Sequence, residues 1–541
     1  MKETLTREHI NAEKILDCKN CENSELLLNG KRNQAAISDL DCCTLKKDGY
    51  ILFDFGREIH GSINIVVHKT KDGQSGKLRV VFGESISEAL SKIGEKNATN
   101  NHSLRDITVE VPFLSNNEIG KTGFRFVKIE ALTEYVEIKS VTAVFIYKDI
   151  QYKGHFECDN ETLNRVWKTG AYTVHLNMQD YLWDGIKRDR LVWIGDMHPE
   201  TSIISSVFGY DDCVPKSLDL TRDETPVSEW MCGMPTYSMW WLKIHRDWYY
   251  QNGDINYLKE QQDYIFKLLK KLFELINDDG TNKIDYKFVD WSSFETDAAD
   301  SGVHAMLTIA MNTGKELCEI LENTELASEC QKNLSKLKNY SPCYADNKQM
   351  AALMAYSGAG DVKEIHDFLK REPLKGLSTF LGFYVLNVYA MSGDIDGAIN
   401  VIENYWGRML EFGATTFWED FDVEWTENAY GIDEFPKDGK SDIHGDNGKY
   451  CYTGLRHSLC HGWAGGPTAF LSRYVLGVEI LKPGCEKIRI NPMLGKLNWV
   501  KGKYPTPYGE IEIEHKRENN EVVTHVKAPK EIEIITDEMV I

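Results

Sequence analysis

The sequence has no excess of positive charge and no long apolar run. It contains 62 Lys and Arg against 83 Asp and Glu, a formal net charge of −21 at pH 7. Nucleic-acid phosphates and anionic membrane surfaces are bound by basic faces, so we expect neither partner. No segment approaches the ~20 apolar residues of a membrane span, and the opening MKETLTREHINAEKIL lacks the apolar core of a signal peptide. We therefore expect a cytoplasmic protein.

The sequence also lacks the short motifs of serine hydrolases, nucleotide-binding proteins and zinc proteases. It has no G-x-S-x-G elbow, no G-x-x-x-x-G-K-[ST] loop, no H-E-x-x-H and no G-x-G-x-x-G at a strand-to-helix junction. Its thirteen cysteines include one C-x-x-C pair, Cys18 and Cys21, without a second pair or nearby histidine to complete a zinc site. We therefore expect reduced thiols, no cofactor and no bound metal.

The length of 541 residues exceeds what one hydrophobic core serves and predicts several domains. Residues 1–150 contain short alternating segments, such as GYILFDFG, SINIVVHK and FRFVKIEAL, separated by Gly, Asn, Asp and Ser turns. This spacing predicts an N-terminal antiparallel β-sandwich. Residues 478–541 return to alternation in KIRINPML and GEIEIEHKRE, which predicts a smaller C-terminal β-sandwich.

Residues 151–477 have helical periodicity, and Asp159 or Asn160 is the expected N-cap of the first helix, ETLNRVWKTGAYTVHL. Roughly ten to twelve helices joined by Gly- or Asp-containing turns suggest antiparallel hairpins that close into a toroid or barrel. The predicted fold class is a multidomain α+β protein, with a helical barrel between two β-sandwich domains. Sugar-processing enzymes have this order of domains, although the order alone assigns no reaction.

The stretch DYLWDGIKRDRLVWIGDMHPE, residues 180–200, interrupts the helical pattern with charged residues set among tryptophans. Such a mixture suits a sugar site, because hydroxyls need charged acceptors and donors while the C–H faces of a sugar ring stack on aromatic surface. The alternative is a solvated loop with its own salt bridges. Trp183 and Trp193 weigh against it, because large aromatic side chains are costly to leave in water.

A second cluster, FGATTFWEDFDVEW at residues 412–425, places four carboxylates between Trp418 and Trp425. Glycoside hydrolysis needs two carboxyl groups, one to protonate the leaving oxygen and one to activate water or attack carbon. The two clusters could supply one each.

Other aromatic and histidine residues lie at predicted breaks between helices. KFVDWSSFE contains Asp290 and Trp291, and LRHSLCHGWAGGP contains His457 and His461. Taken singly, these histidines are more typical of hydrogen-bonded structural positions than of catalytic ones. Three tryptophans lie within a helical pattern and are expected in the core: Trp240, Trp241 and Trp248.

The segment DGIKRDRLVWIGD, residues 184–196, resembles the D-C-P-x-R-E-R-x-G-W-x-G-D pattern of bacterial α-L-rhamnosidases of glycoside hydrolase family 78. Four further segments resemble the same family in the same order: FDFGREIHGSINI, GHFECDNETLNRVW, GATTFWEDF and the SLCHGWAGGP segment with the strand after it. The resemblance covers roughly residues 50 to 495. It implies an (α/α)6 barrel flanked by β-sandwiches, no metal requirement, and hydrolysis with inversion at the anomeric carbon.

The resemblance also implies roles for individual residues. Glu419 matches the general base, and Asp189 stands where a general-acid Glu is expected. That Asp is a departure, because its side chain is one methylene shorter, and a misplacement of about 1 Å can cost about a hundredfold in rate. The neighbouring Gly185, Ile186 and Val192 also depart from the pattern. The sugar-binding candidates are Asp184, Arg188, Asp196 and His461, with Trp193, Trp291 and Trp418 as an apolar wall for a deoxy-sugar methyl group.

These residues predict an inverting exo-glycoside hydrolase that removes terminal α-L-rhamnose, with Asp189 as acid and Glu419 as base. One alternative is a glycosidase of the same fold acting on another deoxy-hexose or a uronic acid. A second is a non-catalytic carbohydrate-binding protein on the same scaffold. The oligomeric state is not readable from the sequence.

Overall fold

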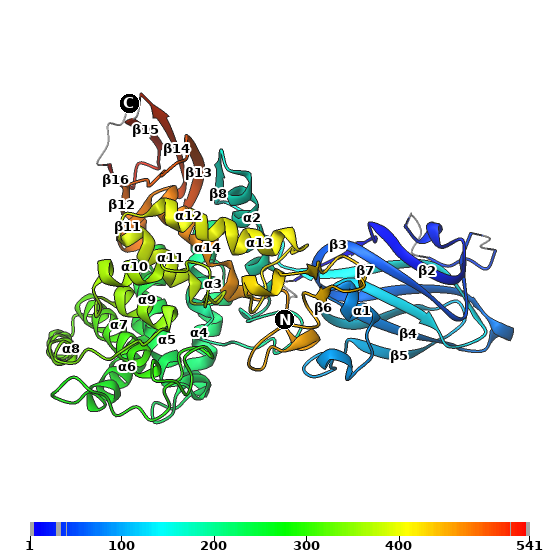
Figure 1. The fold of residues 1–541 in the computed structure, drawn as a ribbon, viewed down its shortest axis with the longest axis horizontal. Helices are drawn as coiled ribbons and strands as arrows, with labels where there is room; N and C mark the ends of the chain where they lie inside the picture. The colour runs from blue at the N-terminus through cyan, green and yellow to red at the C-terminus, as the bar shows by residue number, and fades with distance from the viewer. Residues whose placement is uncertain (1–4, 29–33, 39–40, 520, 537–541) are drawn as a thin grey trace.

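A computed structural model describes residues 5–28, 34–38, 41–519 and 521–536 (Figure 1). The outermost residues of the first and last predicted domains, 1–4 and 537–541, lie outside it. The described chain forms an N-terminal β-domain, a central helical domain and a C-terminal β-domain, as the fold class predicted. None of the described helices is long and apolar enough to cross a membrane.

The N-terminal β-domain is built on a seven-stranded antiparallel sheet. Its order is β1-β7-β3-β6-β4-β5, with β2 paired to β3. The strands are β1 (Thr6–Ile10), β2 (Lys14–Glu22), β3 (Cys43–Thr70), β4 (Gly76–Gly83), β5 (Asp106–Val111), β6 (Asn116–Ala131) and β7 (Tyr135–Tyr147). A short helix, α1 (Ile86–Leu90), follows β4. The apolar cluster of this sheet also includes Leu176, Ile186 and Cys460 of the helical domain, so the two domains share buried surface.

The helical domain is an (α/α)6 barrel, as the resemblance implied. Six inner segments pack in a closed ring, α3-α5-α7-α9-α11-α14 and back to α3. They are α3 (Met197–Val207), α5 (Pro235–Asn252), α7 (Ala299–Ile320), α9 (Lys348–Ser357), α11 (Gly382–Met391) and α14 (Gly466–Phe470). The outer helices are α2 (Glu161–Asn177), α4 (Cys213–Glu224), α6 (Ile255–Glu274), α8 (Thr324–Leu337), α10 (Val362–Leu369), α12 (Ile395–Asn404) and α13 (Trp406–Glu411). Asn160 is the N-cap of α2, and its side chain accepts a hydrogen bond from Leu163 N.

The C-terminal β-domain contains a three-stranded sheet, β11-β12-β16, and a four-stranded sheet, β15-β14-β13-β8. Its strands are β11 (Val478–Lys482), β12 (Lys487–Ile490), β13 (Trp499–Thr506), β14 (Gly509–Glu518), β15 (Glu521–Lys527) and β16 (Glu533–Thr536). Strand β8 (His155–Cys158) lies inside the range predicted for the barrel, yet it pairs with β13. Sequence periodicity could not assign it, because a four-residue strand does not identify its partner.

Candidate active site

Two adjoining cavities, of about 110 and 200 Å³, lie at the end of the barrel where the inner helices begin. They share six wall residues: Asp290, Trp291, Phe380, Glu419, Tyr452 and Trp463. The first is also lined by Asp184, Arg188, Asp189, Trp193, Asp196 and His461. Because the shared residues line both cavities, the two form one cleft with Glu419 at the junction. Concave, partly apolar clefts with a few convergent polar groups are typical ligand sites.

The loop between α2 and α3 and the loop before α14 lie side by side in this cleft. Gly185 forms an isolated antiparallel β-bridge with His461, and Gly462 N donates to Asp184 O at 2.8 Å. Asp184, Arg188 and Asp196 are only 3%, 5% and 2% exposed. The alternative of a solvated, self-paired loop is therefore wrong, because this charged segment is buried against the barrel mouth.

Glu419 is fixed at both its backbone and its side chain. Arg188 Nη2 donates to both carboxylate oxygens at 2.5 Å, and Ser458 N donates to Oε2 at 3.2 Å. The backbone oxygen of Glu419 accepts hydrogen bonds from Thr379 Oγ1 and Trp463 Nε1. A carboxylate has about four acceptor sites, so this arrangement leaves Glu419 an oxygen lone pair for a water or a sugar hydroxyl.

Arg188 joins Glu419 to Asp189. Its Nη1 donates to Asp189 Oδ1 at 3.1 Å while Nη2 holds Glu419. Because one planar guanidinium joins them, the nearest oxygens of the two carboxylates are at most about 8 Å apart. Asp189 also has His102 Nε2 of the N-terminal β-domain at 3.5 Å. The Asp189 side chain is 18% exposed, so it lies nearer the opening than Glu419 does.

The backbone at Asp189 adopts a conformation that most residues avoid. Its φ is 53°, and that of Arg190 is 56°, both in the left-handed region. Asp and Asn tolerate this region better than other non-glycine residues, because their short polar side chains bond locally. Two consecutive left-handed residues turn the loop sharply just after Arg188. The shorter residue at the acid position therefore lies at a sharp turn of the backbone.

Asp184, Asp196 and His461 form a buried polar group on the floor of the cleft. His461 Nε2 lies 3.0 Å from Asp196 Oδ2, and Leu191 N donates to Asp184 Oδ1 at 2.9 Å. Burial raises the pKa of Asp184 well above its usual range, although His461 partly offsets this, and burial likewise raises the pKa of Asp196. Burial alone would lower the pKa of His461, but the Glu419 and Asp196 carboxylates outweigh it and raise that pKa. Glu419 and Asp196 therefore favour the protonated form of the His461 imidazole on this floor.

The aromatic wall differs in part from the prediction. Trp193 and Trp291 line the first cavity, together with Tyr237, Phe380, Tyr452 and Trp463. Trp418 does not, because it is 1% exposed and packs edge-on against Phe421 in the core. Its side chain points away from the cleft that its neighbour Glu419 faces, so its placement in the sugar-binding wall is wrong.

His457 is buried and accepts a hydrogen bond from Asp420 N through Nε2 at 2.9 Å, which fits a structural role. Trp240, Trp241 and Trp248 are in the core as expected.

Sequence reasoning missed Tyr237, Phe380, Tyr452 and Arg456, which also line the first cavity. The last two lie in a segment without helical or strand periodicity, and the first two lie in apolar helical text that reads as core.

Two further carboxyl groups in the cleft have altered acidity. Burial raises the pKa of Asp290 to about 6, against hydrogen bonds from Ser292 Oγ and Trp291 N. Burial, with the nearby Asp290, raises the pKa of Asp420 to about 7. Asp290 lines both cavities and Asp420 lines the second, so both carboxyl groups can hold a proton near neutral pH inside the cleft.

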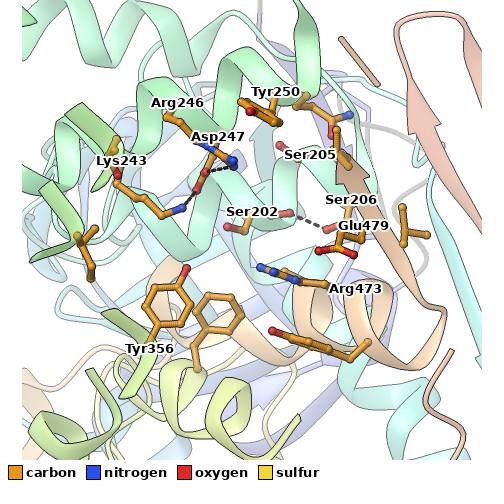
Figure 2. Close-up of a pocket in the computed structure, with 18 of the residues that line it drawn as sticks. Ser202, Ser205, Ser206, Lys243, Arg246, Asp247, Tyr250, Tyr356, Arg473 and Glu479 are labelled. Carbon is orange, nitrogen blue, oxygen red and sulfur yellow. Dashed lines mark hydrogen bonds and ion pairs between the residues drawn. The ribbon is translucent and has the colours of Figure 1, made fainter. Parts of the chain in front are cut away.

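The opposite end of the barrel holds a larger cavity, of about 510 Å³, near the C-terminal β-domain. Figure 2 shows Ser202, Lys243, Asp247 and Arg473 around it. Its acidic residues are paired: Asp247 with Lys243 and Arg246, Glu316 with Arg246, and Glu479 with Arg489. This cavity is larger than either cavity of the cleft, but the chemistry of the predicted site is at the other end.

One buried cluster has the spacing of metal ligands. Atoms of Glu84, Glu88 and His444 lie within 4.8 Å of one another. However, Lys187 Nζ lies 3.2 Å from Glu84 and 3.0 Å from Glu88. Both ring nitrogens of His444 are also engaged, by Ser85 Oγ and by His457 O. The Lys187 ammonium thus already pairs with both carboxylates, and Arg105 Nε lies 3.5 Å from Glu88 Oε1, so these residues fit a salt-bridge cluster better than a metal site.

Comparison with known proteins agrees with the fold. Residues 151–349 match the family model of the bacterial alpha-L-rhamnosidase 6 hairpin glycosidase domain, and residues 477–535 match that of the bacterial alpha-L-rhamnosidase C-terminal domain. Both matched models describe domains of bacterial α-L-rhamnosidases. The six-hairpin glycosidase match includes the loop with Asp184, Arg188, Asp189 and Asp196, whereas Glu419 lies outside the matched range.

Two α-L-rhamnosidases match this chain at low overall identity or over a short segment. An alpha-L-rhamnosidase of Alteromonas sp. (strain LOR) is 24% identical, over 89% of this chain and 55% of that protein. One of Formosa agariphila is 30% identical over 76 residues, 14% of this chain and 8% of that protein. The match to this chain thus spans about half the length of the Alteromonas protein.

Solved structures of six-hairpin glycosidases have the same fold. A glycoside hydrolase family 78 rhamnosidase of Bacillus sp. GL1 superposes with a TM-score of 0.75 and 19% identity, over 95% of this chain and 55% of that one. A rhamnosidase of Klebsiella oxytoca with rhamnose bound gives a TM-score of 0.69 and 17% identity, over 87% of this chain and 96% of that one.

Proposed function

We propose that this chain is an inverting, exo-acting α-L-rhamnosidase that removes terminal α-L-rhamnose from oligosaccharides or glycosides. One observation carries the proposal: Arg188 holds Glu419 and Asp189 on one guanidinium inside a cleft of rhamnosidase domains. Two carboxyl groups placed around one site are what glycoside hydrolysis requires.

In the proposed reaction, Asp189 donates a proton to the glycosidic oxygen and the alcohol leaves. Glu419 accepts a proton from a water molecule, and the water oxygen bonds to the anomeric carbon from the opposite face. An inverting pair is about 6.5–9.5 Å apart to leave room for that water. The upper bound of about 8 Å set by Arg188 allows this separation. Asp189 lies near the opening, where a leaving alcohol can exit.

The remaining wall residues suit a terminal sugar. Asp184, Asp196 and His461 offer acceptors and donors for hydroxyl groups on the floor of the cleft. Trp193 and Trp291 offer apolar surface for a ring face or a methyl group. A floor closed by buried residues favours binding a chain end, which means exo action.

A second candidate substrate is a glycoside of a uronic acid. Among the described residues, Nη1 of Arg456 is buried without a hydrogen-bond partner, and Arg456 lines the first cavity. An arginine in this state suits a carboxylate. The first cavity, however, already contains carboxyl groups of Asp184, Asp189, Asp196 and Glu419, and each of them that is ionised repels another negative charge. We therefore place the neutral deoxy sugar first.

The test is hydrolysis of p-nitrophenyl α-L-rhamnoside by the purified protein, beside p-nitrophenyl fucosides and glucuronides. Proton NMR of the first product formed identifies the anomer: β-L-rhamnose means inversion. We expect rhamnoside turnover that Glu419→Gln abolishes. Turnover of a glucuronide alone would move the substrate to the uronic acids. Sugar binding without turnover of any glycoside would make this a carbohydrate-binding protein.

A further inference from the structure

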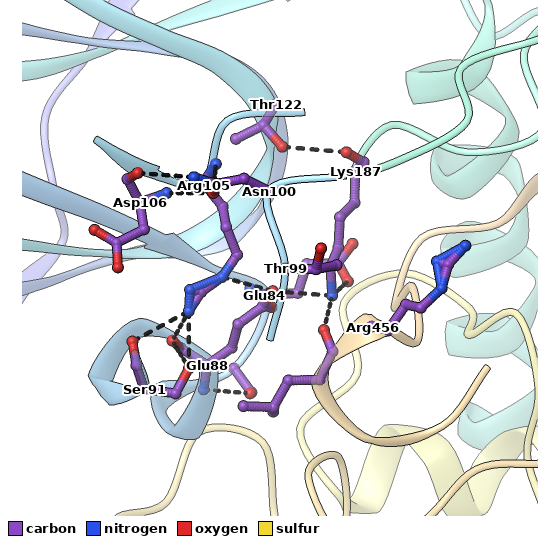
Figure 3. Close-up of polar contacts among 12 residues, drawn as sticks. Glu84, Glu88, Ser91, Thr99, Asn100, Arg105, Asp106, Thr122, Lys187 and Arg456 are labelled. Atoms are coloured by element: carbon purple, nitrogen blue, oxygen red, sulfur yellow. Dashed lines mark hydrogen bonds and ion pairs between the residues drawn. The ribbon is translucent and has the colours of Figure 1, made fainter. Parts of the chain in front are cut away.

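Lys187, the residue before Arg188, is buried, and its ammonium group contacts oxygen atoms of the helical domain and of the N-terminal β-domain (Figure 3). Its Nζ donates to Leu455 O at 2.8 Å and to His457 O at 2.7 Å. It also forms ion pairs with Glu84 and Glu88 of the N-terminal β-domain, and its side chain is 8% exposed. One ammonium group therefore connects the α2–α3 loop, the loop before α14 and the N-terminal β-domain.

Glu84 contacts the loop before α14 directly as well. Its Oε2 accepts a hydrogen bond from Leu459 N at 2.6 Å, and its Oε1 accepts one from Ser458 Oγ at 3.4 Å. The Ser458 backbone in turn makes two hydrogen bonds with Glu419: Glu419 N donates to Ser458 O, and Ser458 N donates to the side-chain oxygen Glu419 Oε2. Only residues 458–459 thus separate the carboxylate of Glu84 from that of Glu419.

The N-terminal β-domain also packs closely against the backbone of the α2–α3 loop. A Cβ added at Gly123 of β6 would lie 2.7 Å from Ile186 Cγ1 and 3.0 Å from Lys187 N. Thr122 Oγ1 donates to Lys187 O at 3.4 Å. The same loop continues into Arg188, which holds Glu419 and Asp189. The β-domain therefore contacts both segments that position the two carboxylates.

We propose that the N-terminal β-domain is part of the catalytic unit, and that Lys187, Glu84 and Glu88 are positioning residues for Arg188 and Glu419. Lys187, Glu84 and Glu88 together form the interdomain lysine cluster. The proposal rests on the proposed function for its kinetic consequence, but not for its structural one. A β-domain that served only as a buttress would need no charged contact with the two loops of the active site.

The charged groups of the interdomain lysine cluster depend on one another, because they are buried together. Burial raises the pKa of Glu84 to about 7 even though Lys187 draws it down. Burial also disfavours the ionised form of Glu88, but Lys187 and Arg105 outweigh it and lower that pKa. Arg105 Nη2 donates to Glu88 O and to Ser91 Oγ, which fixes α1 behind the cluster. Buried ions must keep their partners, because a lone buried charge is strongly unfavourable.

The chain offers a matched control at the same domain boundary. Lys148, which directly follows β7, is buried and forms ion pairs with Asp211 and with Asp212. Like Lys187, it joins the N-terminal β-domain to the barrel through one ammonium and two carboxylates. Its partners precede α4 and are not among the residues that line the cleft. Lys148→Met therefore removes the same kind of interaction away from the site.

The experiment compares Lys187→Met, Lys148→Met and the unmodified protein by steady-state kinetics on a rhamnoside and by hydrogen–deuterium exchange. Each variant is assayed at a temperature where circular dichroism reports it folded. We expect Lys187→Met to lower kcat by about ten- to a hundredfold, because a displacement of about 1 Å has that effect. We expect KM within about threefold, since the contacts of Asp184 and Asp196 remain. Lys148→Met should leave kcat within about twofold.

Hydrogen exchange tests the positioning without any turnover. In Lys187→Met the peptide covering residues 454–461 should exchange faster, because the Lys187 bonds to Leu455 O and His457 O are lost. Lys148→Met should leave this peptide unchanged. If the unmodified protein hydrolyses no glycoside, the proposed function fails while exchange still tests the cluster.

A folded Lys187→Met protein with unchanged kcat, or with unchanged exchange in this peptide, would overturn the proposal. Should Lys187→Met fail to fold, Glu84→Gln replaces it. This variant keeps an oxygen acceptor for Leu459 N but removes the charge that pairs with Lys187, and it should lower kcat with little change in KM. A Glu84→Gln protein with kcat equal to that of the unmodified protein would overturn the proposal as well.

Discussion

Replacing Asp189 by asparagine removes a proton donor without disturbing the loop that carries it. Asn tolerates the left-handed region in which Asp189 lies at φ 53°, whereas alanine there would add about 1 kcal/mol of strain. The amide oxygen can still accept the hydrogen bond from Arg188 Nη1 that Asp189 Oδ1 accepts at 3.1 Å. Asn is therefore a cleaner substitution here than Ala or Glu.

The structure separates the effect of this substitution on stability from its effect on rate. Asp189 is 18% exposed and only one of two carboxylates on Arg188, so we expect the folded state to lose no more than about 1 kcal/mol. Loss of a positioned general acid lowers kcat by about 10²–10⁴, or roughly 3–5 kcal/mol in activation free energy. A change of rate this large, at nearly constant stability, would reflect chemistry and not unfolding.

The assay compares two leaving groups. A p-nitrophenolate leaves as a stabilised anion and needs little protonation, whereas a sugar or alkyl alkoxide needs a proton from the acid. Asp189→Asn should therefore slow an alkyl or sugar rhamnoside by about 10²–10⁴, and p-nitrophenyl rhamnoside by less than about tenfold. Thermal unfolding of both proteins provides the stability control.

Equal slowing of both substrates, or rates within about threefold of the unmodified protein on the alkyl rhamnoside, would refute the assignment of Asp189 as the acid. The next candidate would then be Asp290, whose pKa is raised to about 6 by burial and which lines both cavities of the cleft. Asp290→Asn, assayed with the same two leaving groups, would test it.

Three further predictions follow from the contacts of the site. Arg188→Met removes the guanidinium that pairs with the buried Glu419 and should destabilise the fold by about 3–5 kcal/mol. Adding Glu419→Gln should restore part of this stability in thermal unfolding, and no recovery would contradict the pairing. The folded protein raises the pKa of His461, which contributes stability below the unfolded pKa of about 6.5, and this stability is lost as pH rises through the folded pKa. The difference in Tm between the unmodified protein and His461→Gln should therefore shrink from about pH 6 to about pH 9. A constant difference would contradict the raised pKa. Trp291→Ala should raise KM by about two- to tenfold, whereas Trp418→Phe, in the core, should leave KM unchanged; an equal effect of both would contradict the placement of the wall.

Local patterns were enough to predict the order of domains and part of the site. Alternation and helical periodicity are properties of neighbouring residues, so they identified the β-domains, the barrel and the N-cap at Asn160. The residues of the 180–200 stretch and Glu419 were singled out by residue type, and the structure brings Asp184, Arg188, Asp189, Asp196 and Glu419 into one cleft. Density of charge beside tryptophan was a usable signal, because such a segment is stable only when it is enclosed.

Tertiary structure decided what local pattern could not. Trp418 and Glu419 are adjacent in the sequence, yet one side chain is in the core and the other lines the cleft, because neighbouring side chains point in different directions. Tyr452 and Trp463 join the wall through folding of distant loops, and β8 joins a C-terminal strand more than three hundred residues away.

The sequence by itself determined the fold class, the domain order and the residue types available for chemistry, because these depend on local periodicity and composition. Only the tertiary structure placed Lys187 between Glu84 and Glu88, since the charge of a buried lysine must be matched by carboxylates that the chain brings from another domain. It also decided which carboxyl groups hold protons, because burial and neighbouring charges, not residue type, set those pKa values.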